Sequence, residues 1–563
     1  MRREIVITKK KLDELRAHLL GKSGFKDDEQ LAYILCGVSE GEGYLQLLVR
    51  ELIPVPPDGF EHQSSVRLTV KKEFTRKVYQ RCSKTGLSLI EAHSHPFASD
   101  HVSFSYIDTA NEEKRFPYVE ERIPNIYNAS MVFGQNSIDA HVWDKKTHSV
   151  LPIDLIRVVG TPRTEWVVPT SAKRPKLLSQ NFKPLKPLVK PLVRQIKDRL
   201  PGLLKRPAAS KPVEMSNDDM FSRQVLAFTR QGQELLSRCC VGIVGVGGIG
   251  SIVAEFLARL GVGHIILVDH DIVEWPNLNR MLGTSPANVG LAKVEVIKKH
   301  LNNINPCVKV TPIPTSITDE KALSALKSVD ILIGGVDNHG ARLILNHLSV
   351  KYLIPLIDCG TQIWVEKGRI KEACGQVVIS IPDRFCLECI DRIDRQQAGQ
   401  DLLPAELKER EVRAGYISGL EEPAPAVISL NATVASLAVT ELINLVVGFK
   451  PIAHTIYYDI LRSRVEELRG QAIENCITCG KQGILALGDL EPFPDFEQKK
   501  AKPIPSLKEA GAMDDEQGSG DMEAKTEKAP TREARYVPEG DALRLARKGK
   551  VDEARKQAHA FLP

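Results

Sequence analysis

The sequence lacks a strong net charge, a membrane-length apolar run and a signal peptide. Its 76 Lys and Arg residues against 71 Asp and Glu residues leave a formal charge of +5, so neither nucleic acid nor an anionic membrane surface is an expected partner. No apolar run approaches the roughly 20 residues of a membrane span. The first residues, MRREIVITKKKLDELRAHLL, mix charges with leucine instead of forming a signal-peptide core. We therefore expect a soluble, cytoplasmic protein.

Cysteine is present, but its arrangement argues against disulfides. Eleven cysteines is an odd number, and four of them form two Cys-x-x-Cys pairs, Cys386 with Cys389 and Cys476 with Cys479. In a reducing compartment this pattern indicates a metal site more readily than a disulfide bond. Four thiolates in two such pairs match a closed tetrahedral zinc site, which is structural and leaves no room for a substrate. A thioredoxin-like redox pair is disfavoured because the flanking residues do not fit one.

The chain length favours several domains of about 150 residues each. Residues 1–165 mix strand and helix patterns, which predicts a mixed α/β domain. Residues 166–213 are rich in Pro, Lys and Arg, and we interpret them as a solvated linker. The alternative is a contact with nucleic acid or with an acidic protein. Residues 214–488 follow a strand–helix–strand order that predicts a doubly wound parallel sheet. Residues 489–563 are expected to form a partly disordered tail with a short C-terminal helix.

Within the first segment, hydrophobic periodicity predicts individual elements. The expected helices contain Leu12, Leu15 and Leu19, and run from about Lys72 to Lys84. The expected strands run from Leu31 to Cys36, up to Ile53, from Leu87 to Ala92, from Ser130 to Gly134 and from Ile138 to Trp143.

A candidate metal site follows the strand that ends near Ala92. His93 and His95 alternate along the chain, so they project to the same face and can present two imidazoles to one ion. A catalytic zinc ion needs a third protein ligand and leaves the fourth position for water. Asp108 can supply this ligand from the start of the next helix, where Ser105 lies three residues earlier on the same turn.

With His-x-His-Pro followed by Ser-x-x-Asp, residues 1–160 resemble the JAMM (MPN-plus, or JAB) metalloproteases, which hydrolyse bonds at the C-terminus of ubiquitin-like proteins. The resemblance implies a cytidine-deaminase-like fold, zinc on the three ligands named above, and Ser105 as the group that stabilises the oxyanion. It also implies a catalytic glutamate, for which Glu29 is the candidate; the alternative is an exposed acid. The spacer is slightly longer than the commonest family form, so Asp100 or Ser103 could compete for these roles.

A glycine-rich run predicts a nucleotide site in the second sheet. It follows a strand and opens a helix, so its backbone amides and the helix dipole can hold a phosphate. Its glycines are Gly245, Gly247, Gly248 and Gly250. Asp269 follows the next strand, where such folds bind the ribose. A dehydrogenase would share both features.

Polar groups beyond these strands favour a triphosphate over a dinucleotide. Asn277, Arg280 and Lys293 can neutralise and hydrogen-bond phosphate oxygens. Asp337 follows another parallel strand, where a carboxylate can hold magnesium. We therefore expect ATP and Mg²⁺ as cofactors.

Residues 220–480 resemble the ThiF/MoeB/ubiquitin-activating superfamily, whose members adenylate the C-terminal carboxylate of ubiquitin-fold proteins. The matching segments are FSRQ, GVGGIG, VDHDIVEWPNLNR, GLAK, GVDN and both cysteine pairs. The resemblance implies a Rossmann-like fold with a zinc knot, a homodimer, and catalytic roles for Arg280, Lys293 and Arg223, the last often reaching the other subunit's nucleotide. Met281 is a departure, since the family commonly has glutamine there.

A second departure concerns thioester chemistry. Many ubiquitin-activating relatives carry a nucleophilic cysteine between the two zinc pairs, but residues 390–475 contain none. Of the other cysteines, Cys359 and Cys374 lie nearest the predicted catalytic face, and a packing role is favoured for each. The ordinary thioester step is therefore not expected.

We interpret the chain as a bifunctional enzyme of a prokaryotic ubiquitin-like modification system, in which a zinc protease and an ATP-dependent adenylyltransferase act on one modifier with a C-terminal glycine. A conjugating enzyme or a sulfur donor would be a further partner. One alternative is trimming and activation of a sulfur carrier for cofactor or cysteine biosynthesis. A second alternative is a non-catalytic module that only binds modifiers.

Overall fold

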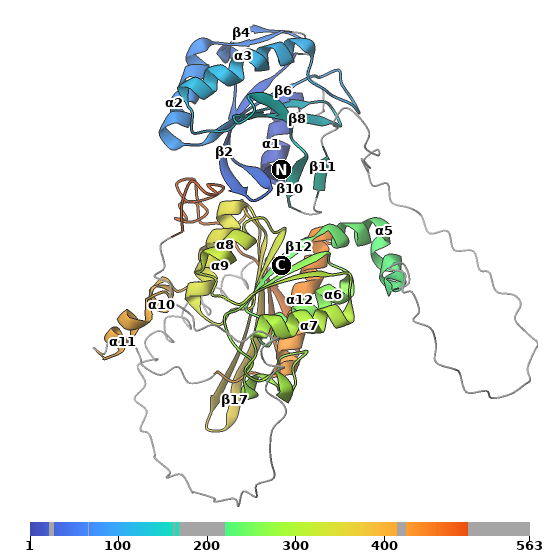
Figure 1. Ribbon diagram of the computed structural model, residues 1–563, viewed down its shortest axis with the longest axis vertical. Helices are drawn as coiled ribbons and strands as arrows, with labels where there is room; N and C mark the ends of the chain where they lie inside the picture. Colours follow the sequence, from blue (N-terminus) through green and yellow to red (C-terminus); the bar gives the residue numbers. More distant parts are fainter. Residues whose placement is uncertain (22–27, 66, 161–163, 168–219, 414–423, 494–563) are drawn as a thin grey trace, which may run out of the picture. The chain divides into compact units, whose positions relative to one another are not determined.

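The structure is a computed structural model (Figure 1), and it describes residues 1–21, 28–65, 67–160, 164–167, 220–413 and 424–493. The predicted linker from residue 168 onward and the predicted tail from residue 494 onward lie outside the described residues. The bounds of the four predicted segments therefore stay predictions.

A mixed sheet of nine strands organises the first 167 residues, in the order β11-β10-β1-β3-β2-β6-β7-β8-β9. Its strands are β1 (Arg2–Thr8), β2 (Leu31–Gly41), β3 (Tyr44–Pro54), β6 (Ser88–Ser94), β7 (Asn128–Phe133), β8 (Ile138–Asp144), β9 (Ser149–Pro152), β10 (Leu155–Val159) and β11 (Thr164–Val167). A separate ribbon joins β4 (Phe60–Gln63) and β5 (Leu68–Val70). The α-helices are α1 (Lys9–Leu20), α2 (Lys72–Thr85) and α3 (Tyr106–Arg122).

Alternation along the strands gives this sheet two apolar faces. Ile34 in β2 packs in one buried cluster with Leu15 of α1, whereas its neighbour Tyr33 packs in another with Val78 of α2 and Val119 of α3. Successive strand residues point to opposite faces, so helices cover both sides of the sheet. The mixed α/β architecture expected from the sequence is therefore present.

The sheet contains strands that the sequence pattern did not predict. Residues 2–8 form β1, which lies between β10 and β3, and the expected helix around Leu12 follows it as α1. β2 also continues past Cys36 to Gly41. The charged residues Arg2, Arg3 and Glu4 precede the apolar run Ile5–Ile7 and obscure its strand pattern in the sequence. In the structure this run is fully buried.

The second sheet has eight strands in the order β14-β13-β12-β15-β16-β17-β18-β19. Its strands are β12 (Cys240–Val244), β13 (His264–Val268), β14 (Lys309–Ile313), β15 (Ile331–Gly334), β16 (Leu356–Glu366), β17 (Arg369–Ser380), β18 (Thr455–Asp459) and β19 (Arg464–Leu468). The first five in spatial order pair parallel, and the remaining pairs are antiparallel. Parallel pairing with crossover helices confirms the predicted Rossmann-like arrangement.

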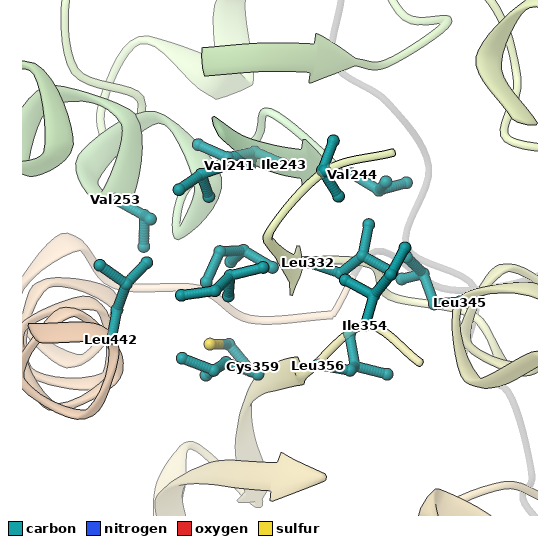
Figure 2. Packing of buried hydrophobic residues seen from close by; sticks show 14 of the residues in the cluster. Val241, Ile243, Val244, Val253, Leu332, Leu345, Ile354, Leu356, Cys359 and Leu442 are labelled. Carbon is teal, nitrogen blue, oxygen red and sulfur yellow. The ribbon is translucent and has the colours of Figure 1, made fainter. Parts of the chain in front are cut away.

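Helices cover both faces of this sheet. The helices are α5 (Ser222–Arg238), α6 (Gly250–Leu260), α7 (Lys293–Ile304), α8 (Glu320–Leu326), α9 (His339–Tyr352), α10 (Arg395–Asp401), α11 (Ala405–Arg413) and α12 (Ile428–Val447). Figure 1 shows α6, α7 and α12 on one side of the strands and α8 and α9 on the other. Figure 2 shows the core between these layers, where Val253 of α6 and Leu442 of α12 meet the strand residues.

Helix α12 corrects one expectation from the sequence. It is 20 residues long with a mean hydropathy of 1.6, which by length and composition is enough to cross a membrane. Asn431 and Glu441 interrupt its apolar pattern, and for that reason the sequence shows no unbroken apolar run. In the structure 61% of the helix window is buried, as in the core helix of a folded domain.

Candidate functional site

The glycine run closes the turn between β12 and α6. Gly245 has a φ of 84°, and a Cβ atom there would lie 2.5 Å from the carbonyl oxygen of Gly335. A Cβ atom at Gly250 would lie 1.9 Å from the carbonyl oxygen of Gly245. Both positions require glycine because the backbones approach too closely for a side chain.

The middle of the run faces open space. At Gly247 no heavy atom lies within 4 Å of the Cβ position, whereas a Cβ atom at Gly248 would lie 2.4 Å from Nδ2 of Asn431 and 3.4 Å from Arg280. An open space beside a glycine backbone and a helix N-terminus is the arrangement that binds a phosphate. The fold therefore brings Arg280 to this loop, as predicted for a phosphate contact.

Asp269 follows β13, and its carboxylate binds the backbone of the glycine loop. Its carboxylate accepts hydrogen bonds from the backbone N–H of Val246 at 2.6 Å and of Asp271 at 2.9 Å. Burial raises the pKa of Asp269, and the charge of Lys293 opposes this shift. The predicted ribose ligand thus also fixes the loop that would carry the phosphates.

The other predicted phosphate contacts are already engaged in local interactions. Lys293 is 9% exposed and donates to Oδ2 of Asp271 at 2.7 Å. Asn277 caps a short 3-10 turn, where its Oδ1 accepts from the N–H of Glu274 at 3.0 Å. Arg280 donates to Oδ1 of Asn279 at 3.3 Å. A triphosphate would have to replace these partners.

Met281 has a packing role. It is 3% exposed and belongs to the core cluster of the second sheet. Its side chain therefore does not face the open space beside Gly247, and the expected departure from the family pattern has a structural explanation: methionine fills the core here.

Asp337 lies at the carboxyl end of β15, next to the glycine loop. Its side chain is exposed, and the contact between Gly335 and Gly245 holds the two loops together. An exposed carboxylate beside a phosphate-binding loop fits a magnesium ion, which takes one or two carboxylates together with phosphate oxygens.

Arg223 is not brought to this loop within one chain. It is exposed at the start of α5, and its neighbour Gln224 donates to the carbonyl of Leu260 at 2.9 Å. Leu260 ends α6, whereas the glycine loop lies at its beginning, about 15 Å away along the helix. A contact of Arg223 with nucleotide would therefore require a second copy of the chain.

The four cysteines of the two Cys-x-x-Cys pairs form one cluster. The Sγ distances are 3.8 Å for Cys386–Cys389, 3.7 Å for Cys386–Cys476 and 3.4 Å for Cys389–Cys479. Sulfur ligands of one tetrahedral zinc ion lie about 3.8 Å apart, so this spacing fits the metal and is far too long for disulfides. A hydrogen bond with Cys479 lowers the pKa of Cys386 to about 6.

In the first sheet, the two histidines and the aspartate predicted as metal ligands converge. Nε2 of His93 lies 3.4 Å from Oδ1 of Asp108, and Nε2 of His95 lies 3.3 Å from Oδ2. Nitrogen and oxygen ligands of one tetrahedral zinc ion lie about 3.3 Å apart. Nε2 of His93 is buried without a hydrogen-bond partner among the described residues, which is costly unless a metal occupies the position.

Helix α3 and its cap hold Asp108. Ser105 Oγ accepts from the N–H of Asp108 at 3.2 Å, and the N–H of Ser105 donates to Oδ2 of Asp108 at 2.7 Å. Burial would raise the pKa of Asp108, but the adjacent imidazoles of His93 and His95 outweigh it and hold the pKa well below its usual range. The Ser-x-x-Asp pattern is thus a capping box that aims the carboxylate at the histidines.

Glu29, the predicted general base, lies beside the cluster. Its Oε1 is 3.9 Å from Nε2 of His95. Burial raises the pKa of Glu29, and the two histidines oppose the shift. The competing residues lie elsewhere: Asp100 accepts from Asn136 at 3.1 Å, and Ser103 meets His95 through its backbone.

Two residues of the nucleotide region escaped the sequence reasoning. Asp271 accepts a hydrogen bond from Lys293, and the Asp-His-Asp pattern after β13 could have indicated this second carboxylate. Asn431 is 3% exposed and lies against Gly248, with its Oδ1 accepting from Thr361 at 3.1 Å. A buried amide in an apolar helix could have indicated this contact.

The second sheet matches known proteins. Residues 221–478 match the model of the ThiF family. The chain is 30% identical over 276 residues to molybdopterin-synthase adenylyltransferase of Escherichia coli, covering 48% of this chain and 99% of the relative. It is 29% identical to a sulfur carrier protein adenylyltransferase of Thermus thermophilus (47% and 91%) and 25% identical to the SAMP-activating enzyme E1 of Haloferax volcanii (48% and 93%).

Proposed function

Since the chain belongs to the ThiF family, we propose that its second sheet carries an ATP-dependent adenylyltransferase that activates the C-terminal carboxylate of a small ubiquitin-fold carrier protein. The observation that carries this proposal is the open space at Gly247, in a glycine loop that begins α6, contacts Arg280 at Gly248 and contacts the Gly335 loop at Gly245. A carboxylate oxygen would attack the α-phosphorus of ATP, the bond to the β-phosphate oxygen would break, and pyrophosphate would leave.

In this reaction two anions must meet, so fixed positive groups lower the barrier. The start of α6 and Arg280 would bind phosphate oxygens, and Asp269 would hold both the loop and the ribose. Lys293 would release Asp271 and bind a phosphate instead. This exchange costs little free energy because the released Asp271 is exposed and can be solvated by water. Asp337 would hold Mg²⁺, which supplies charge neutralisation on the phosphates.

A sulfur carrier is the favoured substrate over a protein modifier. Two of the relatives are named for a sulfur carrier protein and for molybdopterin synthase. In addition, the two cysteines nearest the predicted catalytic face are poor thiolates for accepting the acyl group, because burial raises the pKa of Cys359 and of Cys374. Cys307 is exposed and precedes β14, so it lies at the amino end of the parallel strands, whereas the glycine loop lies at their carboxyl end. An external sulfur donor would then receive the acyl group.

Pyrophosphate exchange into ATP tests the proposal. The full chain, incubated with Mg²⁺ and a carrier ending in Gly-Gly, should catalyse exchange, and Asp337→Ala should abolish it. Glu320→Ala, an exposed acid in the first turn of α8, is the matched control and should exchange normally. Absence of exchange by the wild-type chain with every Gly-ended carrier would leave the binding-module hypothesis standing.

The cluster in the first sheet favours a second activity, zinc-dependent peptide hydrolysis at a carrier C-terminus. His93, His95 and Asp108 leave a fourth position for water, and Glu29 lies close enough to take its proton and pass it to the leaving amine. Ser105, at the N-terminus of α3, would stabilise the oxyanion. The zinc ion would polarise the carbonyl and lower the pKa of the bound water.

Cleavage of a carrier with extra residues after the glycine tests this activity. The wild-type chain should release the extension and contain zinc, and His95→Ala should lose both. His62→Ala, which removes an exposed histidine on the β4–β5 ribbon, is the control. Full cleavage by a metal-free preparation would contradict the assignment.

We also propose a homodimer in which Arg223 reaches the partner's nucleotide, because α5 holds it away from the chain's own loop. Light scattering gives the oligomeric state. Mixing Arg223→Ala with Asp337→Ala chains should restore partial exchange if the arginine acts across the dimer.

A further inference from the structure

A buried group of three charges lies beneath the loop that carries Asp337. Asp358 in β16 is completely buried, and both its oxygens accept from Nε of Arg342 in α9, at 3.0 and 3.1 Å. Nε of Arg392 donates to Oδ2 of the same carboxylate at 2.9 Å. Buried charges are costly to desolvate, and two arginines exceed what one carboxylate needs for neutrality. This arrangement has no role in the proposed chemistry so far.

Arg342 connects the carboxylate to the Asp337 loop. Besides binding Asp358, its Nη2 donates to the carbonyl oxygen of Val336 at 2.9 Å. Val336 immediately precedes Asp337. The planar guanidinium has donors on separate edges, so it can bind the carboxylate and the carbonyl together in fixed geometry.

Asp358 also supports the loop directly. A Cβ atom at Gly334 would lie 3.1 Å from Oδ1 of Asp358, so the carboxylate packs against the start of the loop. The next residue, Gly335, packs on the carbonyl of Gly245 in the phosphate loop. Displacement of residues 334–336 would therefore move Asp337 relative to the phosphate-binding loop.

Arg392 contacts a different part of the domain. Its Nη1 donates to Oε1 of Gln376 in β17 at 2.7 Å, and its N–H donates to the carbonyl of Leu387, within the first Cys-x-x-Cys pair, at 3.0 Å. Within the part of the chain that the structure describes, no hydrogen bond or ion pair joins Arg392 to residues 334–337. The two arginines thus share one carboxylate, but Arg342 is the one that contacts the loop.

We propose that Arg342, oriented by Asp358, is a positioning residue that fixes the Val336 carbonyl and thereby holds the Asp337 carboxylate in the position from which it would bind Mg²⁺. It does not touch the nucleotide. The proposal rests on the proposed adenylyltransferase function, because it concerns the magnesium ligand of that site. Residues that orient a metal ligand typically change metal affinity about 10- to 100-fold when altered.

The test compares two lysine substitutions in the same network. Arg342→Lys keeps a cation against Asp358 but loses the second donor to Val336, so we expect the Kd of Mg·ATP to rise about tenfold or more. Binding of ATP in EDTA should be unchanged. Arg392→Lys also keeps the charge but has no loop contact, so its Mg·ATP affinity should stay within about twofold of wild type. Calorimetry on the full chain measures these dissociation constants for the wild type and both variants.

A double variant and a second substitution keep the test decisive. Arg342→Lys combined with Asp337→Ala should bind Mg·ATP no more weakly than Asp337→Ala alone, since both act through the same carboxylate. If Arg342→Lys is unfolded, Arg342→Gln replaces it, because Arg392 still neutralises Asp358 there. Equal losses in the Arg342 and Arg392 variants, or an equal loss with and without Mg²⁺, would overturn the positioning role. Failure of the wild type to bind Mg·ATP would instead overturn the proposed function.

Discussion

Alanine substitutions at two glycines of one loop should separate the stability of the fold from nucleotide binding. At Gly245 the φ of 84° costs an alanine about 1–2 kcal/mol, and its Cβ would lie 2.5 Å from the Gly335 carbonyl oxygen, which adds about 1–3 kcal/mol of overpacking. At Gly247 the Cβ position is empty to 4 Å. We therefore expect Gly245→Ala to lose about 2–5 kcal/mol and Gly247→Ala to stay within about 0.5 kcal/mol of wild type.

Thermal unfolding and ATP titration of the same preparations measure the two effects. For a domain of this size, the loss at Gly245 corresponds to a melting temperature lower by roughly 5–15 °C. Gly247→Ala should have the melting temperature of the wild type. It should bind Mg·ATP at least about tenfold more weakly, because its methyl group would occupy the space in which a phosphate would bind. Wild-type ATP affinity in Gly247→Ala, or an unchanged melting temperature in Gly245→Ala, would refute the geometry assigned to this loop.

Three further outcomes are expected. Burial lowers the pKa of His347 in α9 to about 4, so this histidine is neutral in the folded protein. The free energy of unfolding should therefore fall as the pH drops from 6.5 toward 4, by at most about 3 kcal/mol. Denaturant unfolding of His347→Gln should show a smaller fall over the same pH range. Asp108→Asn should lose one zinc ion per chain in elemental analysis, whereas Asp100→Asn should keep it, because Asp100 binds Asn136 instead. Removing metal from the cysteine cluster, or Cys476→Ser, should lower the melting temperature by about 10 °C or more, and an unchanged melt after verified metal loss would contradict a structural role.

The sequence predicted best where chemistry depends on residue type at fixed spacing. Gly245 and Gly250 were recognisable because only glycine permits the close backbone contacts found there. Asp108 was recognisable through the Ser-x-x-Asp turn, since a capping box is a local structure that the sequence itself determines. The parallel sheet followed from alternating strand and helix periods.

Long-range relations were beyond the sequence. The pairing of β1 with β10 joins Glu4 to Leu155, and its pairing with β3 joins Arg2 to Tyr44, and no local pattern specifies either. The pattern also could not show that Lys293 is already paired with Asp271, because this contact depends on how α7 packs beside β13. Nor could it place Arg223 at the far end of α6, where the path of α5 decides its position.

The two ligand clusters differ in a way that assigns them different chemistry. The cysteine cluster supplies four sulfur atoms from the protein, so a tetrahedral ion would be fully coordinated and could only stabilise the chain around it. The cluster in the first sheet supplies three ligands, and the nearby carboxylate, Glu29, lies 3.9 Å from Nε2 of His95. A structural site gains nothing from an acid whose pKa burial raises, whereas a general base does. This difference is the reason that we propose a reactive centre in the first sheet and a structural metal site in the second.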